Sequence, residues 1–304
     1  MDPSTGKLIT KVARAGKKDI DMAVEAAWGA KEAWSKVSPA QRSQLIHKFA
    51  DELLRHKDEL AHIEGLDNGK PLWLAEKDVD FAASIFRYNA GACERLGGMS
   101  FNRDGMNQFG YVRKEPIGVA GCITPWNYPL LMTTFKMAPM LASGTTGLFK
   151  SPELAPLSSL KMAEIWSGIE GVVPGVVNFV PGIGAEAGEA IVDHPQVNSI
   201  HYTGSTAIGK RIKSRAAETL KRVCLELGGK NPLIVFDDAD LMKATTCAKV
   251  FGSVNTGQFC GAPSRVFVHE KVHDQFVENL VGMLQSQKYG RFDEPDIWGG
   301  PVIS

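Results

Sequence analysis

Residues 117–150 read IGVAGCITPWNYPLLMTTFKMAPMLASGTTGLFK, and they alternate between two kinds of pattern. Residues 117–123 and 146–150 are short apolar runs rich in β-forming residues, whereas residues 130–143 have the length and composition of a helix. A strand, a helix and a second strand in this order form a βαβ unit. The stretch therefore predicts two parallel strands joined by a helix.

The alternation continues toward the C-terminus, where β-rich runs again follow helical ones. The β-rich runs are residues 176–180, 199–203 and 223–225, and the helical runs are residues 158–168, 185–193 and 205–217. When helices cover both faces of a parallel sheet, its strands have continuous apolar sequences of this kind. We therefore expect an α/β fold with a mostly parallel sheet and helices on both of its faces.

Before residue 117 the chain is predominantly helical. Residues 18–37 place six apolar side chains at helical spacing, namely Ile20, Ala23, Val24, Ala27, Ala30 and Trp34. Ser38 and Pro39 suit the N-cap and the first turn of a second helix. Residues 67–71 read DNGKP, a composition that predicts a turn.

A further helix is predicted over residues 72–96, and an excursion is predicted after it. The aromatic side chains of this helix are expected in the core: Phe81, Phe86 and Tyr88. Two glycines end the helix, and residues 99–113 then suit a two-stranded hairpin around Asp104 and Gly105.

A second unit is predicted near residue 226. After a pair of glycines the pattern restarts with a β-rich run, a helix, another β-rich run and a final helix. These segments are residues 232–236, 240–254, 265–268 and 271–286. We therefore divide the chain into residues 1–225 and residues 226–304.

Composition excludes several classes of function. Lys plus Arg equals Asp plus Glu at 34 each, so the net charge favours neither nucleic acid nor an anionic membrane as partner. The apolar runs are shorter than the ~18 residues of a membrane span. Five cysteines without a C-x-x-C pair favour free thiols, and seven scattered histidines predict no metal site.

One thiol and one carboxylate stand in segments suited to covalent catalysis. Glu226 opens the segment ELGGK (226–230), and Cys260 ends the segment GQFC (257–260). A thiolate is a nucleophile, and a carboxylate can accept a proton from water or from a thiol. By residue type alone, a buried structural cysteine and a turn-capping glutamate explain the pair better.

Their surroundings change that balance, because five segments together resemble signatures of the aldehyde dehydrogenase superfamily. In chain order they are TPWNYP (124–129), FKSPE (149–153), YTGSTAIG (202–209), ELGGK (226–230) and GQFC (257–260). The resemblance covers essentially all 304 residues, which correspond to the first two-thirds or so of a usual member. It implies a Rossmann-like cofactor domain over residues 1–225 and a partial α/β catalytic domain over residues 226–304. A short N-terminal part and the C-terminal third are expected to be lacking.

The resemblance also implies catalytic roles. Cys260 would be the nucleophile, Glu226 the general base and Asn127 an oxyanion donor together with the Cys260 N–H. Lys136 would take part in proton transfer. Two alternatives stay open from the residues themselves: Asn127 as a helix N-cap and Lys136 as a solvated charge on a helix.

For the cofactor, the resemblance places Lys150 and Glu153 on the adenosine ribose, although a surface ion pair is the default for this spacing. A carboxylate beside the 2′-hydroxyl would repel a 2′-phosphate, which favours NAD over NADP. Residues 204–209 would hold the pyrophosphate at the start of a helix. The implied cofactor residues are Thr124, Pro125, Trp126, Lys150, Glu153, Gly184, Gly204, Ser205, Leu227 and Gly228.

The implied function is the oxidation of an aldehyde to a carboxylic acid with NAD, through a thiohemiacetal and a thioester on Cys260. The alternative is a truncated, catalytically silent subunit that binds the cofactor or serves a structural role, because a later Glu-x-Phe-Gly-Pro segment of the family is lacking. The partners would be a small aldehyde and further copies in a homodimer or homotetramer, joined through the hairpin of residues 99–113. We expect a cytoplasmic protein, or a mitochondrial one if a presequence precedes the chain.

Overall fold

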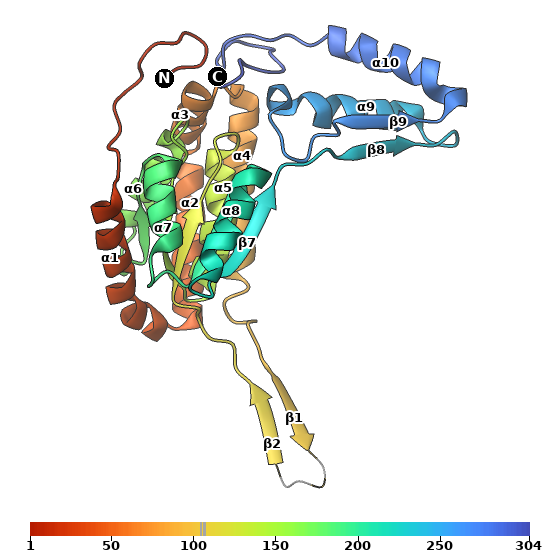
Figure 1. The fold of residues 1–304 in the computed structure, drawn as a ribbon. Helices are drawn as coiled ribbons and strands as arrows, with labels where there is room; N and C mark the ends of the chain where they lie inside the picture. Colours follow the sequence, from red (N-terminus) through yellow and green to blue (C-terminus); the bar gives the residue numbers. More distant parts are fainter. Residues whose placement is uncertain (104, 106–107) are drawn as a thin grey trace.

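The computed structural model describes residues 1–103, 105 and 108–304, and its main body is a parallel sheet between two layers of helices (Figure 1). The sheet order is β5-β4-β3-β6-β7, and every neighbouring pair is parallel. The strands are β3 (Val119–Ile123), β4 (Thr146–Lys150), β5 (Val177–Phe179), β6 (Ser199–Gly204) and β7 (Arg222–Leu227). The predicted α/β class with a mostly parallel sheet is confirmed.

Alternation along β3 divides the core between the two faces of the sheet. Ala120 and Cys122 face one cluster, whereas Val119 and Ile123 face the other. The first cluster holds the helices α2 (Pro39–Arg55), α3 (Lys57–Asn68), α4 (Leu72–Ala90), α5 (Pro129–Ala142) and α6 (Leu157–Ser167). The second holds most of α1 (Lys17–Lys36), the π-helical turn η1 (Gly184–Gly188), α7 (Glu189–Asp193) and α8 (Thr206–Ala217), while Ala30 and Trp34 of α1 belong to the first cluster. The six apolar residues predicted for the first helix are all buried.

The strand order places a crevice at the carboxyl end of the sheet. From β3 the chain winds outward to β4 and β5, and it then returns to form β6 on the other side of β3. Connections that leave neighbouring strands in opposite directions open a gap above their carboxyl ends, which is where α/β sheets bind ligands. The loops after β3 and β6 therefore border the crevice.

Several local expectations were wrong. The sequence pattern predicted Phe81 and Tyr88 in the core, but they are 51% and 74% exposed, because they lie seven residues apart on the face of α4 opposite Phe86. The same helix ends at Ala90 rather than at residue 96. The predicted helix over 185–193 begins with a π-helical turn at Gly184–Gly188.

The turn expected at residues 67–71 is also shorter than predicted. Asp67 and Asn68 form the last turn of α3, and Gly69 ends that helix in the left-handed region with φ 85°. Hydrophobic periodicity does not reveal helix α3, because its buried face includes the polar residues Glu64, Asp67 and Asn68. These residues prove important at the site.

A hairpin leaves the main body between α4 and β3 (Figure 1). Strand β1 (Met99–Arg103) pairs with the antiparallel strand β2 (Gln108–Val112), as predicted. Asp104 of the expected turn lies outside the described residues. The hairpin exposes Phe101, Phe109 and Tyr111, and its role in joining subunits stays a prediction.

The C-terminal part forms a smaller α/β unit beside the main sheet (Figure 1). Strand β8 (Pro232–Val235) pairs in parallel with β9 (Arg265–Val268). The remaining elements are α9 (Leu241–Ser253), α10 (His273–Gln285) and the 3₁₀ turns η2 (Val254–Gly257) and η3 (Glu270–Val272). Strand β7 runs to Leu227, so the predicted division after residue 225 cuts the end of the main sheet. The division into two domains itself stays a prediction.

Among the described helices, none combines the length and the apolar character that a membrane crossing requires.

Candidate active site and cofactor cleft

Two adjoining cavities lie at the carboxyl end of the sheet, and Trp126 and Thr203 line both. The first measures about 490 Å³ and is lined by six of the predicted cofactor residues: Thr124, Pro125, Trp126, Lys150, Glu153 and Gly184. The second measures about 760 Å³ and is lined by Asn127, Gly204, Ser205, Glu226, Leu227, Gly228 and Cys260. The fold therefore gathers every predicted site residue except Lys136 around these two cavities, while their roles stay predictions.

Cys260 follows a strained loop. Three consecutive residues before it have left-handed backbones: Asn255 with φ 50°, Thr256 with φ 57° and Gly257 with φ 75°. Asn255 donates its side-chain amide to the Asn127 carbonyl at 2.9 Å, and Thr256 donates its hydroxyl to the Gly300 carbonyl at 2.8 Å. Strained non-glycine residues that side-chain bonds hold in place occur mainly at functional sites. The Cys260 thiol itself is free and exposed.

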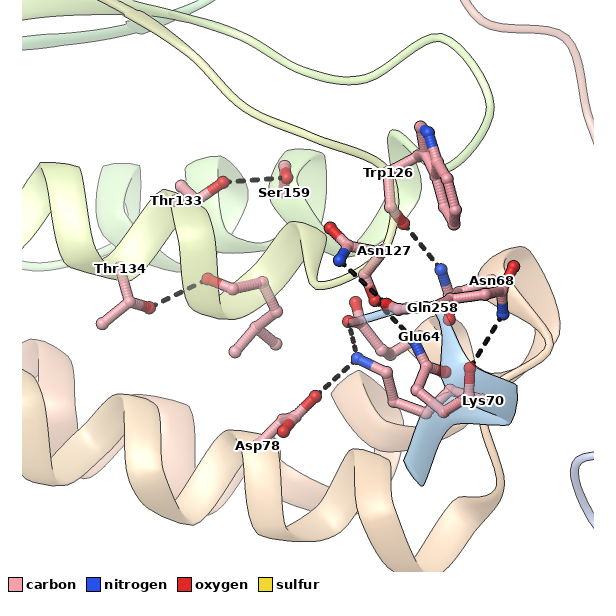
Figure 2. A network of polar contacts seen from close by, with 12 residues as sticks. Glu64, Asn68, Lys70, Asp78, Trp126, Asn127, Thr133, Thr134, Ser159 and Gln258 are labelled. Atoms are coloured by element: carbon pink, nitrogen blue, oxygen red, sulfur yellow. Dashed lines mark hydrogen bonds and ion pairs between the residues drawn. The ribbon is translucent and has the colours of Figure 1, made fainter. Parts of the chain in front are cut away.

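Asn127 is bonded to the loop that precedes Cys260. Its Nδ2 donates to the Gln258 carbonyl at 2.9 Å, and Gln258 in turn donates its side-chain amide to the Asn255 carbonyl at 3.0 Å (Figure 2). The N-cap alternative for Asn127 is wrong, because α5 begins at Pro129 and takes Tyr128 as its N-cap. An amide nitrogen carries two hydrogens, so one remains for a second acceptor in the cavity.

Glu226 and Lys136 lie in different cavities. Glu226 is exposed near the end of β7 and lines the cavity of Cys260. Lys136 projects from α5 and donates to the Thr203 hydroxyl at 2.6 Å, and it lines a neighbouring cavity with Cys122. Lys136 is half-buried rather than solvated. Burial lowers the pKa of Lys136, although nearby thiols and Glu226 oppose the effect.

Lys150 and Glu153 form an ion pair, but it is not the surface pair that their spacing favours by default. The Lys150 side chain is buried, whereas that of Glu153 is 47% exposed. Burial opposes ionisation of Glu153, yet the hydrogen bond from Lys150 lowers the pKa of this carboxyl overall. Lys150 has three N–H donors, and among the described residues its ammonium bonds Glu153 alone. Donors therefore remain for a ligand in the cleft.

The start of α8 borders the second cavity. Ser205 caps this 12-residue helix by accepting from the Ile208 N–H at 3.4 Å. Position 204 favours glycine, because a Cβ there would lie 2.2 Å from the Tyr202 hydroxyl oxygen. Free N–H groups and the helix dipole suit an anionic group at this end.

Sequence patterns missed the polar cluster beneath this site. Asn68 donates its amide to the Trp126 carbonyl at 2.6 Å. Lys70 is fully buried and bonds the carboxylates of Glu64 at 2.9 Å and Asp78 at 2.5 Å (Figure 2). The one available signal was the spacing of Glu64 and Asn68, which places two polar side chains on one face of a helix beside a lysine.

Asp67, in the same segment, should make the free energy of unfolding depend on pH. Its carboxylate accepts from the Leu157 N–H at 2.8 Å at the start of α6, and burial raises the pKa of Asp67 to about 7. A carboxyl with a raised pKa binds more protons in the folded state than in the unfolded state, so stability falls as pH rises from about 4 to 7. Asp67→Asn keeps an acceptor for Leu157 but cannot ionise. We expect this variant to exceed the parent by on the order of 2 kcal/mol at pH 8 and to match it near pH 4.

Urea unfolding at both pH values measures this difference. Asp51→Asn is the matched control, because Asp51 is exposed and pairs only with Arg87 among the described side chains. An Asp67→Asn advantage that is the same at pH 4 and pH 8 contradicts the prediction.

Comparison with known proteins identifies the fold. The family model described as "Aldehyde dehydrogenase family" matches residues 1–304. A mitochondrial aldehyde dehydrogenase of Leishmania tarentolae is 43% identical over 306 aligned residues, with 100% of this chain and 61% of the relative covered. The chain thus spans about 61% of the length of that relative.

Solved structures agree. A mutant aldehyde dehydrogenase from Bacillus cereus matches with a TM-score of 0.97 at 42% identity, covering 100% of this chain and 62% of the other. PnpE from Pseudomonas sp. WBC-3, in complex with nicotinamide adenine dinucleotide, matches with a TM-score of 0.97 at 40% identity and the same coverage.

Proposed function

The chain belongs to the aldehyde dehydrogenase family, and on that premise we propose that it oxidises a small aldehyde to a carboxylic acid with NAD. One observation carries the proposal: Cys260, Asn127 and Glu226 line a single cavity, and that cavity adjoins a cleft bearing the Lys150–Glu153 pair. A nucleophile, an oxyanion donor and a base thus meet beside a place for a nucleotide.

The residues of the cavity have the following proposed roles. The Cys260 thiolate forms a bond to the aldehyde carbonyl carbon, and the carbonyl electron pair moves to oxygen. The Cys260 N–H and the remaining N–H of the Asn127 side chain donate to that oxygen. Loss of a hydride from the same carbon, with the electron pair on oxygen re-forming the C=O bond, would leave a thioester on Cys260. A water molecule, whose proton Glu226 accepts, then cleaves this thioester, which releases the acid and the Cys260 thiolate. Lys136, bonded to Thr203 at the cavity wall, is proposed to pass the proton onward.

NAD is proposed to lie in the first cavity and to reach into the adjoining second one. When bound, it supplies the acceptor for the hydride that leaves the aldehyde carbon. The free donors of Lys150 and the carboxylate of Glu153 suit ribose hydroxyls, and the start of α8 suits the pyrophosphate. Apolar walls for the adenine ring come from Ile183, Val192, Ile208 and Ile212. The structure of PnpE with NAD supports the same cofactor.

NAD rather than NADP is proposed from the charges in the cleft. Glu153 is ionised there, and the two arginines of the cavity, Arg211 and Arg215, are already paired with Glu189. Glu153→Gln removes the charge that repels a 2′-phosphate. We expect the ratio of the NADPH and NADH dissociation constants to fall about tenfold in this variant.

Fluorescence titration of both reduced cofactors measures that ratio. Glu164→Gln, which alters an exposed carboxylate on α6, should leave it unchanged. If the ratio of dissociation constants in Glu153→Gln equals that of the parent, Glu153 does not contact the adenosine ribose.

The aldehyde is proposed to bind against the aromatic wall of the second cavity, which includes Phe135, Phe251 and Phe259. Further copies of the chain are proposed partners, joined through β1 and β2 in a homodimer or homotetramer. The cytoplasm stays the predicted compartment. Aldehyde-dependent NADH formation, with Cys260→Ala as the control, tests the proposed activity; a folded, NAD-binding chain without it would favour the silent subunit.

A further inference from the structure

We infer that Asn68 is a positioning residue, which holds the Trp126–Asn127 peptide so that Asn127 faces the loop of Cys260. The inference rests on the proposed function. Asn68 is fully buried in the last turn of α3, and its amide donates to the Trp126 carbonyl at 2.6 Å (Figure 2). Asn68 lines neither of the two cavities, so it acts through its neighbours rather than on a substrate.

Asn127 connects the bond between Asn68 and Trp126 to the loop before Cys260. The Trp126 carbonyl and the Asn127 N–H belong to one rigid peptide plane, so holding the carbonyl also sets the Asn127 Cα. Asn127 and the loop then exchange two bonds: the Asn127 amide donates to the Gln258 carbonyl, and the Asn255 amide donates to the Asn127 carbonyl, both at 2.9 Å. Rotation of the Trp126–Asn127 peptide would strain both bonds.

The support behind Asn68 is rigid. Gly69 follows with φ 85°, and a Cβ there would lie 3.0 Å from side-chain atoms of Pro3 and Pro301, so the chain is tightly packed at this point. Lys70 is locked between Glu64 and Asp78, and its ammonium also lies 4.1 Å from the centre of the Tyr128 ring. The loop of Trp126, Asn127 and Tyr128 is thus held at both ends from one segment, residues 68–70.

The side chain of Asn68 is used as a donor only. Its Oδ1 is buried and has no hydrogen-bond partner among the described residues. An unpaired buried acceptor is unfavourable for stability, so packing alone does not explain an amide at this position. The donor function toward Trp126 does explain it.

This asymmetry allows a sharp test, because a carboxyl group of the same shape donates only when it is protonated. Asn68→Asp should lack the bond at pH 8.5 and regain it on acidification, since burial raises the pKa of a carboxyl. Asn68→Ala lacks the donor at every pH. Other titratable groups lie in the segments around this position: Glu64 and Asp67 on α3, Lys70 just after it, and Asp78 and Tyr128, which both contact Lys70. Asn68→Ala keeps these groups but has no titratable side chain at position 68, so its pH dependence measures their effect alone.

The first readout is the aldehyde-dependent NADH burst, relative to the parent at each pH. We expect a loss of about tenfold or more for both variants at pH 8.5. At pH 6 the aspartate variant should recover and the alanine variant should not. Alkylation of Cys260 by iodoacetamide, which forms no oxyanion, should stay within about twofold of the parent. A role in folding alone would lower both reactions together and would not follow pH in this way.

The second readout does not depend on turnover. In chain labelled with 5-fluorotryptophan, the ¹⁹F signal of Trp126 is assigned with Trp126→Phe among the six tryptophans. It should shift in Asn68→Ala at both pH values, and in Asn68→Asp only at pH 8.5. Asn89→Ala is the control, because the Asn89 amide donates to the Ile85 carbonyl at 2.9 Å and Asn89 lines neither cavity.

A Trp126 signal in Asn68→Ala that coincides with the parental one overturns the inference, and so does a parental NADH burst in that variant. If the parent forms no NADH, the proposed function fails for this chain, and the Trp126 signals alone still decide whether Asn68 positions the loop.

Discussion

Cys260→Ala is expected to abolish aldehyde-dependent NADH formation, with a loss of at least roughly a thousandfold. The thiol is the only proposed nucleophile, and the loop before it is held in a strained, left-handed conformation by Asn127 and Gly300. Alanine keeps the loop and its bonds but offers no atom that can bond to the carbonyl carbon. Stopped-flow absorbance with a short aliphatic aldehyde and NAD measures the effect.

Cys247→Ala is the matched control for this experiment. Cys247 lies on α9, its thiol is free, and it does not line the cavity of Cys260. Its alanine variant should form NADH at the parental rate. Normal turnover by Cys260→Ala would refute the proposed covalent mechanism, whatever the other variants do.

Lys70→Met is expected to destabilise the fold by about 3–5 kcal/mol at pH 8. The Lys70, Glu64 and Asp78 side chains are respectively 0%, 0% and 6% exposed, so removal of the ammonium leaves two carboxylates buried without a cation. Burial already raises the pKa of Asp78 to about 6 in the presence of Lys70. Loss of the ammonium raises the pKa of this carboxyl further, and the deficit of Lys70→Met then develops between the two folded-state pKa values, so it should shrink as pH falls from 8 toward about 6.

Urea unfolding of Lys70→Met and Lys161→Met makes the comparison. Lys161 also bridges two carboxylates, but those of Glu59 and Glu164 are 47% and 72% exposed. Its loss should cost about 1 kcal/mol or less. Equal losses in the two variants, or a Lys70→Met deficit that does not change with pH, would contradict the buried-cluster account.

The two charge clusters show where sequence reasoning succeeded and failed. Lys150 and Glu153 could be singled out because they end a β-rich run, and the carboxyl ends of parallel strands meet at one edge of the sheet. Lys70, Glu64 and Asp78 could not, because a lysine in a polar turn between two helices is normally solvated. Their burial follows from the packing of α3 against α4 beneath the loop of Tyr128, which no local pattern reveals.

Exposure of single side chains shows the same limit. Helical spacing placed both Phe81 and Phe86 on α4, yet Phe86 packs edge-to-face on Phe49, whereas Phe81 lines the second cavity. A helix of mixed composition has more apolar side chains than one buried face accommodates, and the neighbouring elements decide which of them are covered.

Most of the strands and helices, the parallel sheet and the strand ends at which polar side chains gather could be predicted from the sequence, because periodicity and turn residues are local properties. Helix α3, whose buried face is partly polar, could not be predicted. Three features arise only in the folded chain: the bond of Asn68 to Trp126, the bond of Asn127 to the loop before Cys260, and the position of Lys136 outside that cavity. These contacts join residues far apart in the chain. Their geometry depends on how the helices and the sheet pack, and that packing is a property of the whole fold.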